Sequence, residues 1–246
     1  MKIILLGAKG IMGGHVITAA NKSGYEISSY VDVKCDPNVL NEYTKIADVK
    51  ENADVIIDFS FHGVVGEILD YAVSTSTPVV IATTGHTDEE KELIVKASEK
   101  TAVFYSGNMS VGIATLCDVV KKVVSMFPDA DVEIIETHHT RKLDAPSGTA
   151  KMLFSAIQDV RKDAYANYGR SGLCKREKNE VGINSIRVGN IVGIHEVIVG
   201  TASEQITLKH EAYDRALFAD GAIKAAEFMV GKGAGLYTME ELLKNH

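Results

Sequence analysis

The sequence predicts an α/β protein in which a doubly wound parallel sheet is joined to a second α+β domain with a mixed sheet. Three observations lead to this prediction. Short apolar runs alternate with helical patterns up to residue 105, and such alternation is typical of parallel sheets covered by helices. A glycine-rich loop follows the first apolar run. Beyond residue 110 the pattern changes, and three strand-like runs follow one another between residues 182 and 209.

The first part of the chain divides into short elements in a regular order. Residues 2–6 form an apolar run that ends at Gly7, as expected of a buried parallel strand. A helix follows the glycine loop, and apolar runs then alternate with helical spacing. We expect strands at 2–6, 26–31, 53–59, 78–82 and 102–105, and helices at 11–21, 64–74 and 88–100.

The later part of the chain has a different pattern. Apolar residues from 113 to 127 follow helical spacing, and Pro128 ends that helix. A strand at 131–136 precedes a helix that begins after Ser147, and the polar stretch 161–179 is typical of a loop. Strand-like runs at 182–188, 194–200 and 204–209 indicate an antiparallel or mixed sheet, and an alanine-rich helix at 216–230 is the last predicted element.

Composition disfavours several classes of protein. The formal net charge is −7, and nucleic-acid binding depends mainly on Lys and Arg that neutralise phosphates. The three cysteines are far apart and odd in number, so they predict neither a disulfide framework nor a zinc ribbon. No apolar stretch approaches the ~20 residues of a membrane helix, and the first apolar run is too short for a signal peptide. We therefore expect a cytoplasmic protein with no nucleic-acid or membrane partner.

The loop from Gly7 to Gly13 reads Gly-Ala-Lys-Gly-Ile-Met-Gly and lies between a strand and a helix, the context of a Rossmann-like dinucleotide site. Gly7 permits the tight turn, Gly10 lets backbone N–H groups approach a pyrophosphate, and Gly13 lets the helix pack close to the sheet. The helix N-terminus favours phosphates. The spacing is GxxGxxG rather than GxGxxG, so a glycine turn that only packs is the alternative. No Gly-Lys-Ser or Gly-Lys-Thr closes the loop, which argues against a P-loop.

Asp32 ends the second predicted strand, some 20 residues beyond the glycines, where an acid typically binds the ribose hydroxyls of NAD. A carboxylate there repels the extra phosphate of NADP. The alternative is a solvated loop aspartate, and Asp36 is a nearby competitor. Lys9 and Lys34 would soften the preference by pairing with that phosphate. We expect a modest preference for NADH or near-equal use of NADH and NADPH.

Two turns after later strands are weaker candidates. Residues 82–85 read Ala-Thr-Thr-Gly, and 106–109 read Ser-Gly-Asn-Met. Each follows a predicted parallel strand, and such folds bind ligands at the carboxyl ends of their strands. A Thr-Gly turn without a functional role is nearly as good an explanation of the first turn on its own.

The stretch 136–150, Glu-Thr-His-His-Thr-Arg-Lys-Leu-Asp-Ala-Pro-Ser-Gly-Thr-Ala, is the most informative motif. It gathers cations into one predicted loop of an acidic protein, directly before a helix whose N-terminus offers N–H groups to an anion. His and Lys side chains can donate protons or pair with carboxylates. A zinc site is disfavoured because no HExxH spacing and no third soft ligand is evident, and Ser147 alone would be explained by helix capping.

This stretch resembles the signature of 4-hydroxy-tetrahydrodipicolinate reductases, also called dihydrodipicolinate reductases, whose loop reads Glu-x-His-His-x-x-Lys-x-Asp-Ala-Pro-Ser-Gly-Thr-Ala. The resemblance also covers the glycine loop, Thr83-Thr84-Gly85 and residues 108–112, 187–189, 193, 195 and 215–221, so it spans essentially the whole chain. Val33, Ala82, Asn190 and the Phe61-His62-Gly63 segment depart from the common pattern.

The resemblance implies roles for individual residues. His138 is the general acid near the reacting ring and Lys142 the proton donor, while His139, Gly148 and Thr149 hold the substrate carboxylates with help from Ser147. The cofactor, NADH or NADPH, is lined by Gly7, Ala8, Lys9, Gly10, Ile11, Met12, Asp32, Ala82, Thr83, Thr84, Ser106, Gly107, Asn108 and Met109.

The resemblance also implies a domain plan and a reaction. Residues 1–109 and 215–246 form the dinucleotide-binding domain, and 110–214 form a substrate-binding and oligomerisation domain of a homotetramer. The enzyme reduces a small cyclic dicarboxylate in lysine and diaminopimelate biosynthesis. Two alternatives remain at this point: another two-domain NAD(P)-dependent dehydrogenase of a small carboxylate, and a non-catalytic module that senses NAD(H).

Overall fold

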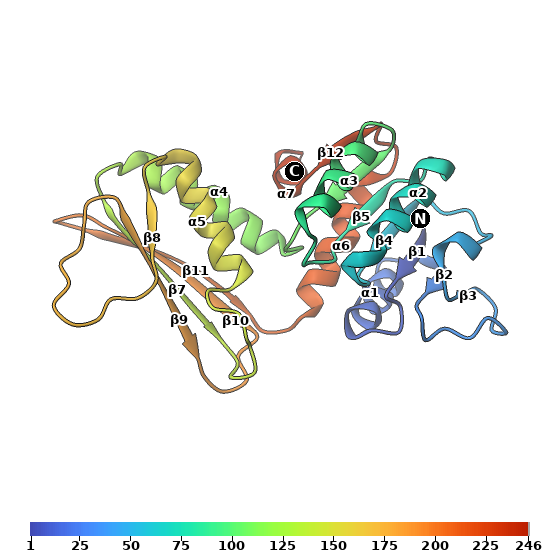
Figure 1. The fold of residues 1–246 in the computed structure, drawn as a ribbon, viewed down its shortest axis with the longest axis horizontal. Helices are drawn as coiled ribbons and strands as arrows, with labels where there is room; N and C mark the ends of the chain where they lie inside the picture. The colour runs from blue at the N-terminus through green and yellow to red at the C-terminus, as the bar shows by residue number, and fades with distance from the viewer. Residues whose placement is uncertain (246) are drawn as a thin grey trace. The chain divides into compact units, whose positions relative to one another are not determined.

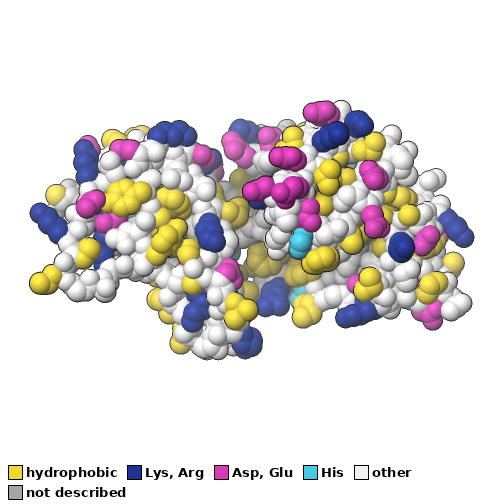
Figure 2. Space-filling model, in the orientation of Figure 1, with side chains coloured by type: hydrophobic (Ala, Val, Ile, Leu, Met, Phe, Trp, Pro, Cys, Tyr) yellow, Lys and Arg dark blue, Asp and Glu magenta, His cyan; other side chains and the backbone are white. Residues whose placement is uncertain are grey.

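The computed structural model describes residues 1–245, and the chain forms two compact units. Met1–Ser110 and Arg215–His246 make up the first unit, and Val111–Asp214 make up the second. Each unit has a hydrophobic core of its own. Acidic and basic side chains are interspersed over the visible face of both units (Figure 2).

A seven-stranded sheet in which every strand pair is parallel forms the centre of the first unit. The strand order is β12-β6-β5-β4-β1-β2-β3. The order reverses between β1 and β4, and open α/β sheets bind ligands beyond the carboxyl ends of the strands at such a point. The strands are β1 (Lys2–Leu6), β2 (Glu26–Val31), β3 (Glu42–Tyr43), β4 (Val55–Asp58), β5 (Val79–Ile81), β6 (Ala102–Tyr105) and β12 (Gly235–Tyr237).

Helices cover both faces of this sheet. Because crossovers between parallel strands are right-handed, α1 (Ile11–Lys22) lies on one face, and α2 (Val65–Thr75) and α3 (Asp88–Ser98) lie on the other. The late helix α6 (Ala216–Met229) packs beside α1 and against β4 and β5 (Figure 1). All residues of β4 and β5 are buried, as expected of strands covered on both sides. Short 3₁₀ helices at Ile46–Asp48 and His62–Val64 and helix α7 (Met239–Lys244) complete the unit.

The second unit contains a mixed sheet with the strand order β11-β10-β7-β9-β8. The strands are β7 (Asp131–His138), β8 (Tyr165–Asn167), β9 (Glu180–Arg187), β10 (Gly193–Gly200) and β11 (Gln205–Ala212). β7 runs parallel to β9 and antiparallel to β10. Two helices, α4 (Val111–Met126) and α5 (Gly148–Val160), lie side by side against the sheet (Figure 1). Burial alternates along β7 and β10, so one face belongs to the core and the other is half-exposed.

The predicted fold class is confirmed, with corrections at several elements. The predicted strand at 131–136 continues to His138, whose carbonyl oxygen accepts the Val188 N–H at 2.9 Å. Thus Thr137 and His138 belong to a strand and not to the loop. The stretch 161–179 contains the short strand β8, and β3, β12 and α7 were not predicted. None of the helices among residues 1–245 combines the length and apolar character that a membrane crossing requires.

Candidate active site

The glycine loop lies at the carboxyl end of β1, beside the reversal in strand order. Gly7 has a φ of +73°, and a Cβ atom there would stand 2.3 Å from the carbonyl oxygen of Phe59, which follows β4. A Cβ atom on Gly13 would stand 2.3 Å from the carbonyl oxygen of Gly7. Both positions therefore require glycine, because the backbones of the loop, the sheet and α1 meet without space for a side chain.

The N-terminus of α1 fits an anionic group. Its N-cap is Gly10, which has no side chain to accept hydrogen bonds from the N–H groups of the first turn. The first turn also carries no acidic residue that would repel an anion. The N–H groups of Ala8 and Gly10 bond to the carbonyl oxygens of Val31 and Gly7. The donors that the helix presents are therefore those of its first turn, which begins with the exposed Ile11 and half-buried Met12. This arrangement suits the pyrophosphate of a dinucleotide.

Asp32 directly follows β2 and connects it to the glycine loop. Its carboxylate accepts the backbone N–H groups of Lys9 and Lys34 at 3.1 and 3.0 Å. The carboxylate is thus held in place at the end of β2, where the ribose of a dinucleotide is expected. The Lys9 side chain forms an ion pair with Glu42 on β3.

The two later turns also lie at the carboxyl edge of the first sheet. Residues 82–84 follow β5, where Ala82 N–H and Thr83 Oγ1 both donate to the carbonyl oxygen of Asp58. Residues 106–109 follow β6, and Ser106 Oγ donates to the carbonyl oxygen of Asn108 at 2.7 Å. Gly107 has open space at its Cβ position, whereas Met109 is buried. All predicted cofactor residues therefore come from the carboxyl ends of β1, β2, β5 and β6.

A buried carboxylate organises the predicted catalytic residues of the second unit. Glu136 on β7 is fully buried, and its Oε2 lies 2.5 Å from His138 Nδ1. Arg187 at the end of β9 binds both carboxylate oxygens, at 2.9 and 2.8 Å. Burial raises the pKa of Glu136, but the hydrogen bonds from His138 and Arg187 outweigh it, so the pKa lies below its ordinary value. Glu136 is therefore an anion that fixes both partners.

Glu136 also reaches the start of α5. Its Oε1 accepts the backbone N–H of Ser147, the N-cap of α5, at 3.1 Å. Ser147 Oγ accepts the Ala150 N–H and lies 3.0 Å from His195 Nε2 on β10. We refer to Glu136, His138, Ser147, Arg187 and His195 as the Glu136 cluster.

The two histidines of the Glu136 cluster differ in environment. Their rings pack edge to face, with centroids 5.1 Å apart. Burial and then the charge of the His138 ring lower the pKa of His195 to about 3. His195 is thus neutral, and we assign its Nε2 as the acceptor of the Ser147 hydroxyl. The other histidine, His138, is hydrogen-bonded to Glu136 through Nδ1. A Cβ atom on Gly193 would stand only 3.1 Å from the other ring nitrogen of His138, Nε2. The glycine on β10 therefore leaves space at that nitrogen.

The remaining predicted residues adjoin this cluster. Lys142 Nζ lies 2.8 Å from Asp144 Oδ1, and the carbonyl oxygen of Asp144 accepts a hydrogen bond from Arg187 at 2.6 Å. The backbone N–H of His139 donates to the carbonyl oxygen of Ile191 at 2.8 Å. Gly148 and Thr149 form the first turn of α5, at the positive end of the helix dipole. The structure therefore brings the predicted proton donors and the predicted carboxylate-binding segment together around Glu136.

Sequence reasoning assigned no role to Glu136, Asp144, Arg187 or His195. Glu136 and Asp144 lie inside the recognised motif, but a motif does not show which of its side chains are buried. Arg187 and His195 come from strands far along the chain, and only the register of β9 and β10 against β7 places them near His138. No three His, Cys, Asp or Glu side chains within residues 1–245 are grouped so that they could hold a metal ion.

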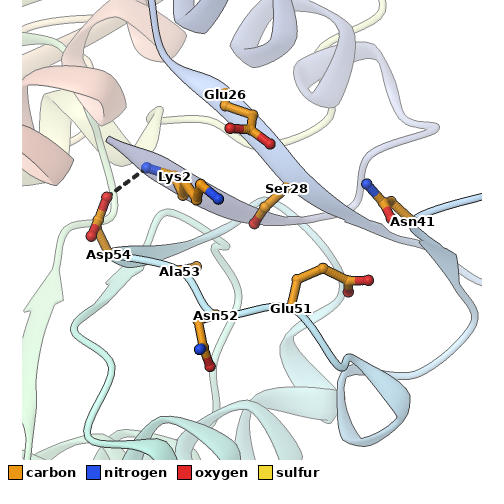
Figure 3. A pocket seen from close by; sticks show the side chains of 8 residues that line it. All are labelled: Lys2, Glu26, Ser28, Asn41, Glu51, Asn52, Ala53 and Asp54. Atoms are coloured by element: carbon orange, nitrogen blue, oxygen red, sulfur yellow. Dashed lines mark hydrogen bonds between the residues drawn. The ribbon is translucent and has the colours of Figure 1, made fainter.

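A separate pocket lies at the amino ends of strands β1 and β2 in the first sheet (Figure 3). Lys2 and Glu26 stand at the amino ends of β1 and β2, and Lys2 N–H donates to Asp54 at 2.6 Å. The cofactor residues follow the carboxyl ends of the same strands, so this pocket is not part of the candidate site. It is lined by Lys2, Glu26, Ser28, Asn41, Glu51, Asn52, Ala53 and Asp54.

The parallel sheet with its glycine loop and the buried acid–base cluster of the second unit are features of a nicotinamide-nucleotide oxidoreductase. The family model for the N-terminus of dihydrodipicolinate reductase matches residues 1–109, and the model for its C-terminus matches residues 112–243. The chain therefore belongs to the dihydrodipicolinate reductase family. This finding confirms the family and the enzyme class that the sequence predicted, an NAD(P)H-dependent oxidoreductase.

Individual relatives agree with this assignment. The chain is 43% identical to the 4-hydroxy-tetrahydrodipicolinate reductase of Clostridium novyi, covering 99% of this chain and 98% of the relative. It is 41% identical to the reductase of the same name from Caldanaerobacter subterraneus, over 99% and 98% of the two chains.

Solved structures share the fold. A dipicolinate-bound dihydrodipicolinate reductase from a Paenisporosarcina species superposes with a TM-score of 0.82 at 23% identity, covering 97% of each chain. An amine dehydrogenase from Mycobacterium smegmatis has a TM-score of 0.68 at 10% identity, covering 98% of this chain and 95% of its own. The same two-unit fold thus occurs in dehydrogenases of different names.

Proposed function

We propose that this protein reduces 4-hydroxy-tetrahydrodipicolinate, through its dehydrated form dihydrodipicolinate, to tetrahydrodipicolinate with NADH or NADPH. The observation that carries the proposal is the Glu136 cluster. A buried carboxylate aligns His138 beside the N-terminus of α5, which combines a proton donor with a binding site for carboxylates. A cyclic substrate with two carboxylates needs both features.

When bound, the nicotinamide supplies the hydride. Hydride addition to the conjugated cyclic imine leaves an enamine, and the reaction is complete when a carbon of that enamine gains a proton. His138 supports this step in its imidazolium form. Its Nδ1–H donates to the Glu136 anion, so Nε2–H is the proton that remains to be given. The Glu136 carboxylate orients the His138 ring through Nδ1, while Arg187 keeps Glu136 itself ionised.

Lys142 serves the same proton-delivery step. Asp144 pairs with its ammonium group, and the carbonyl oxygen of Asp144 is bound by Arg187. The two bonds connect Lys142 to the Glu136 cluster and limit the positions that its side chain can take. Lys142 and His138 are therefore held by one connected set of charges, and we propose that they act together in protonation.

The substrate carboxylates bind at the start of α5. The helix N-terminus at Gly148 attracts anions, and the Cβ position of Gly148 meets no atom within 4 Å. Ser147 Oγ is already engaged with Ala150 and His195, so its role is to fix the helix start. His139 extends the anion site on the side of the loop that follows β7.

We further propose a homotetramer that is formed through the sheet of the second unit. The face of this sheet opposite α4 and α5 carries Ile135 and Ile198, which are half-exposed. Apolar side chains on a flat sheet face favour burial against a second copy. Light scattering at micromolar concentration should give four chains per particle, and a monomer would contradict the proposal.

We place the enzyme in the cytoplasm, where thiols such as Cys35, Cys117 and Cys174 stay reduced.

A coupled assay tests the proposed reaction. Pyruvate and aspartate semialdehyde, condensed by the synthase that precedes this step, should support oxidation of NADH or NADPH by this protein. Omission of the synthase provides the control, because the two precursors alone should not be reduced. Oxidation with another oxo acid and none with the condensation product would show that the proposed substrate is wrong.

A further inference from the structure

Glu42 is an acidic residue beside the proposed ribose site. It begins the two-residue strand β3, which pairs with the end of β2. The next residue of β3 is Tyr43, whose carbonyl oxygen accepts the N–H of Asp32 at 3.0 Å. The Glu42 side chain is only 15% exposed. Its carboxylate accepts the Asp36 N–H at 2.9 Å and forms an ion pair with Lys9.

Lys9 is therefore held by two carboxylates. Asp32 binds its backbone N–H, and Glu42 binds its ammonium group. The hydrogen bond from Lys9 lowers the pKa of Glu42, so the pair is ionic at neutral pH. This geometry changes the expectation from sequence, in which the Lys9 side chain pairs with the extra phosphate of NADP. A 2′-phosphate would have to compete with Glu42 for the charge of the Lys9 ammonium group.

We infer that Glu42 is a specificity-determining residue that disfavours NADPH. It acts in two ways: it adds a second negative charge to that of Asp32, and it keeps the Lys9 ammonium from a 2′-phosphate. A free lysine forms charge-assisted hydrogen bonds with a 2′-phosphate, whereas two carboxylates repel it. The inference rests on the proposed function, because it requires the adenosine ribose to bind at the end of β2.

The experiment compares nucleotide use by the unmodified protein and three variants. Glu42→Gln removes the charge but keeps an oxygen for the Asp36 N–H. The dissociation constants of NADH and NADPH are measured by fluorescence, and kcat/KM by steady-state kinetics. We expect the NADPH-to-NADH ratio of kcat/KM to rise about tenfold in Glu42→Gln, an effect within reach of one charged contact. In Lys9→Met/Glu42→Gln most of this rise should disappear, because Lys9 provides it.

Glu26→Gln is the matched control. It neutralises an exposed carboxylate at the amino end of β2, and its ratio should equal that of the unmodified protein. If NADH binds and the ratio in Glu42→Gln stays within twofold of the unmodified value, the inference is wrong while the proposed function stands. If the double variant keeps the full rise, the part assigned to Lys9 is wrong. If neither nucleotide binds the unmodified protein, the proposed function fails and the inference with it.

Discussion

The two units hold their carboxylates in contrasting ways. In the first unit, Asp32 and Glu42 lie at the rim of the sheet, where backbone N–H groups and one lysine hold them. In the second unit, Glu136 is fully buried and binds a histidine, an arginine and the start of a helix. Charges at a rim are screened by solvent, whereas a buried charge that loses a partner is strongly destabilising. We therefore expect changes at the rim to alter the nucleotide preference, and changes in the Glu136 cluster to alter the rate of the reaction.

The largest expected effect is on the proton donors. His138→Gln and Lys142→Met should each lower kcat by ~10²–10⁴-fold, the usual contribution of a positioned acid. NADH affinity should barely change, because neither residue belongs to the first unit. The double variant should lose less than the product of the single losses, since both residues serve one step.

Steady-state kinetics beside NADH titration by fluorescence checks this prediction. Lys162→Met is the matched control, because Lys162 is exposed and follows the C-terminal end of α5, opposite the turn where we propose that the substrate binds. Near-normal kcat in both variants, or a proportional loss of NADH binding, would show that these residues are not the proton donors.

A smaller effect is expected when the buried carboxylate loses its charge. Glu136→Gln leaves Arg187 without its anionic partner, which should lower the free energy of unfolding by about 3 kcal/mol, the low end for a broken buried pair. Arg187 is partly exposed, which favours the low end. The variant should also lower kcat, because the His138 ring loses the carboxylate that orients it through Nδ1. Glu196→Gln, half-exposed on β10, is the control for stability. An unchanged kcat would contradict a positioning role for Glu136.

The smallest of the three effects concerns acid stability. The folded-state pKa of His195, about 3, lies below its ordinary value of 6.5, so the unfolded chain binds the proton more readily. Stability should therefore fall as the pH drops below 6.5, by about 2 kcal/mol at pH 5. The lowered pKa of Glu136 adds a further loss only below its ordinary range. Urea unfolding at pH 7.5 and pH 5 measures the difference. His195→Gln should reduce it, and an equal difference in that variant would contradict the prediction.

Local motifs in the sequence predicted much of this arrangement. The glycine loop could be recognised because its glycines are required within a single turn, and the motif 136–150 because its residues are consecutive. Glu42 could not be predicted, because a two-residue strand is too short to show a period of two. Arg187 and His195 could not be placed either, since their approach to His138 depends on strand register. The strand containing His138 was predicted to end at residue 136 because the polar run beyond it resembles a loop.

The position of α6 and β12 in the chain has a consequence for biosynthesis. Both elements complete the first unit, since α6 buries one side of its length against that unit and β12 extends the sheet beside β6. A Cβ atom on Gly221 of α6 would stand 1.7 Å from the carbonyl oxygen of Met109, so the fit between these distant segments is close. On the ribosome, the second unit emerges as one uninterrupted segment before these last elements are made. The nucleotide-binding sheet, although six of its seven strands precede the second unit in the chain, completes its core only after the second unit has been translated.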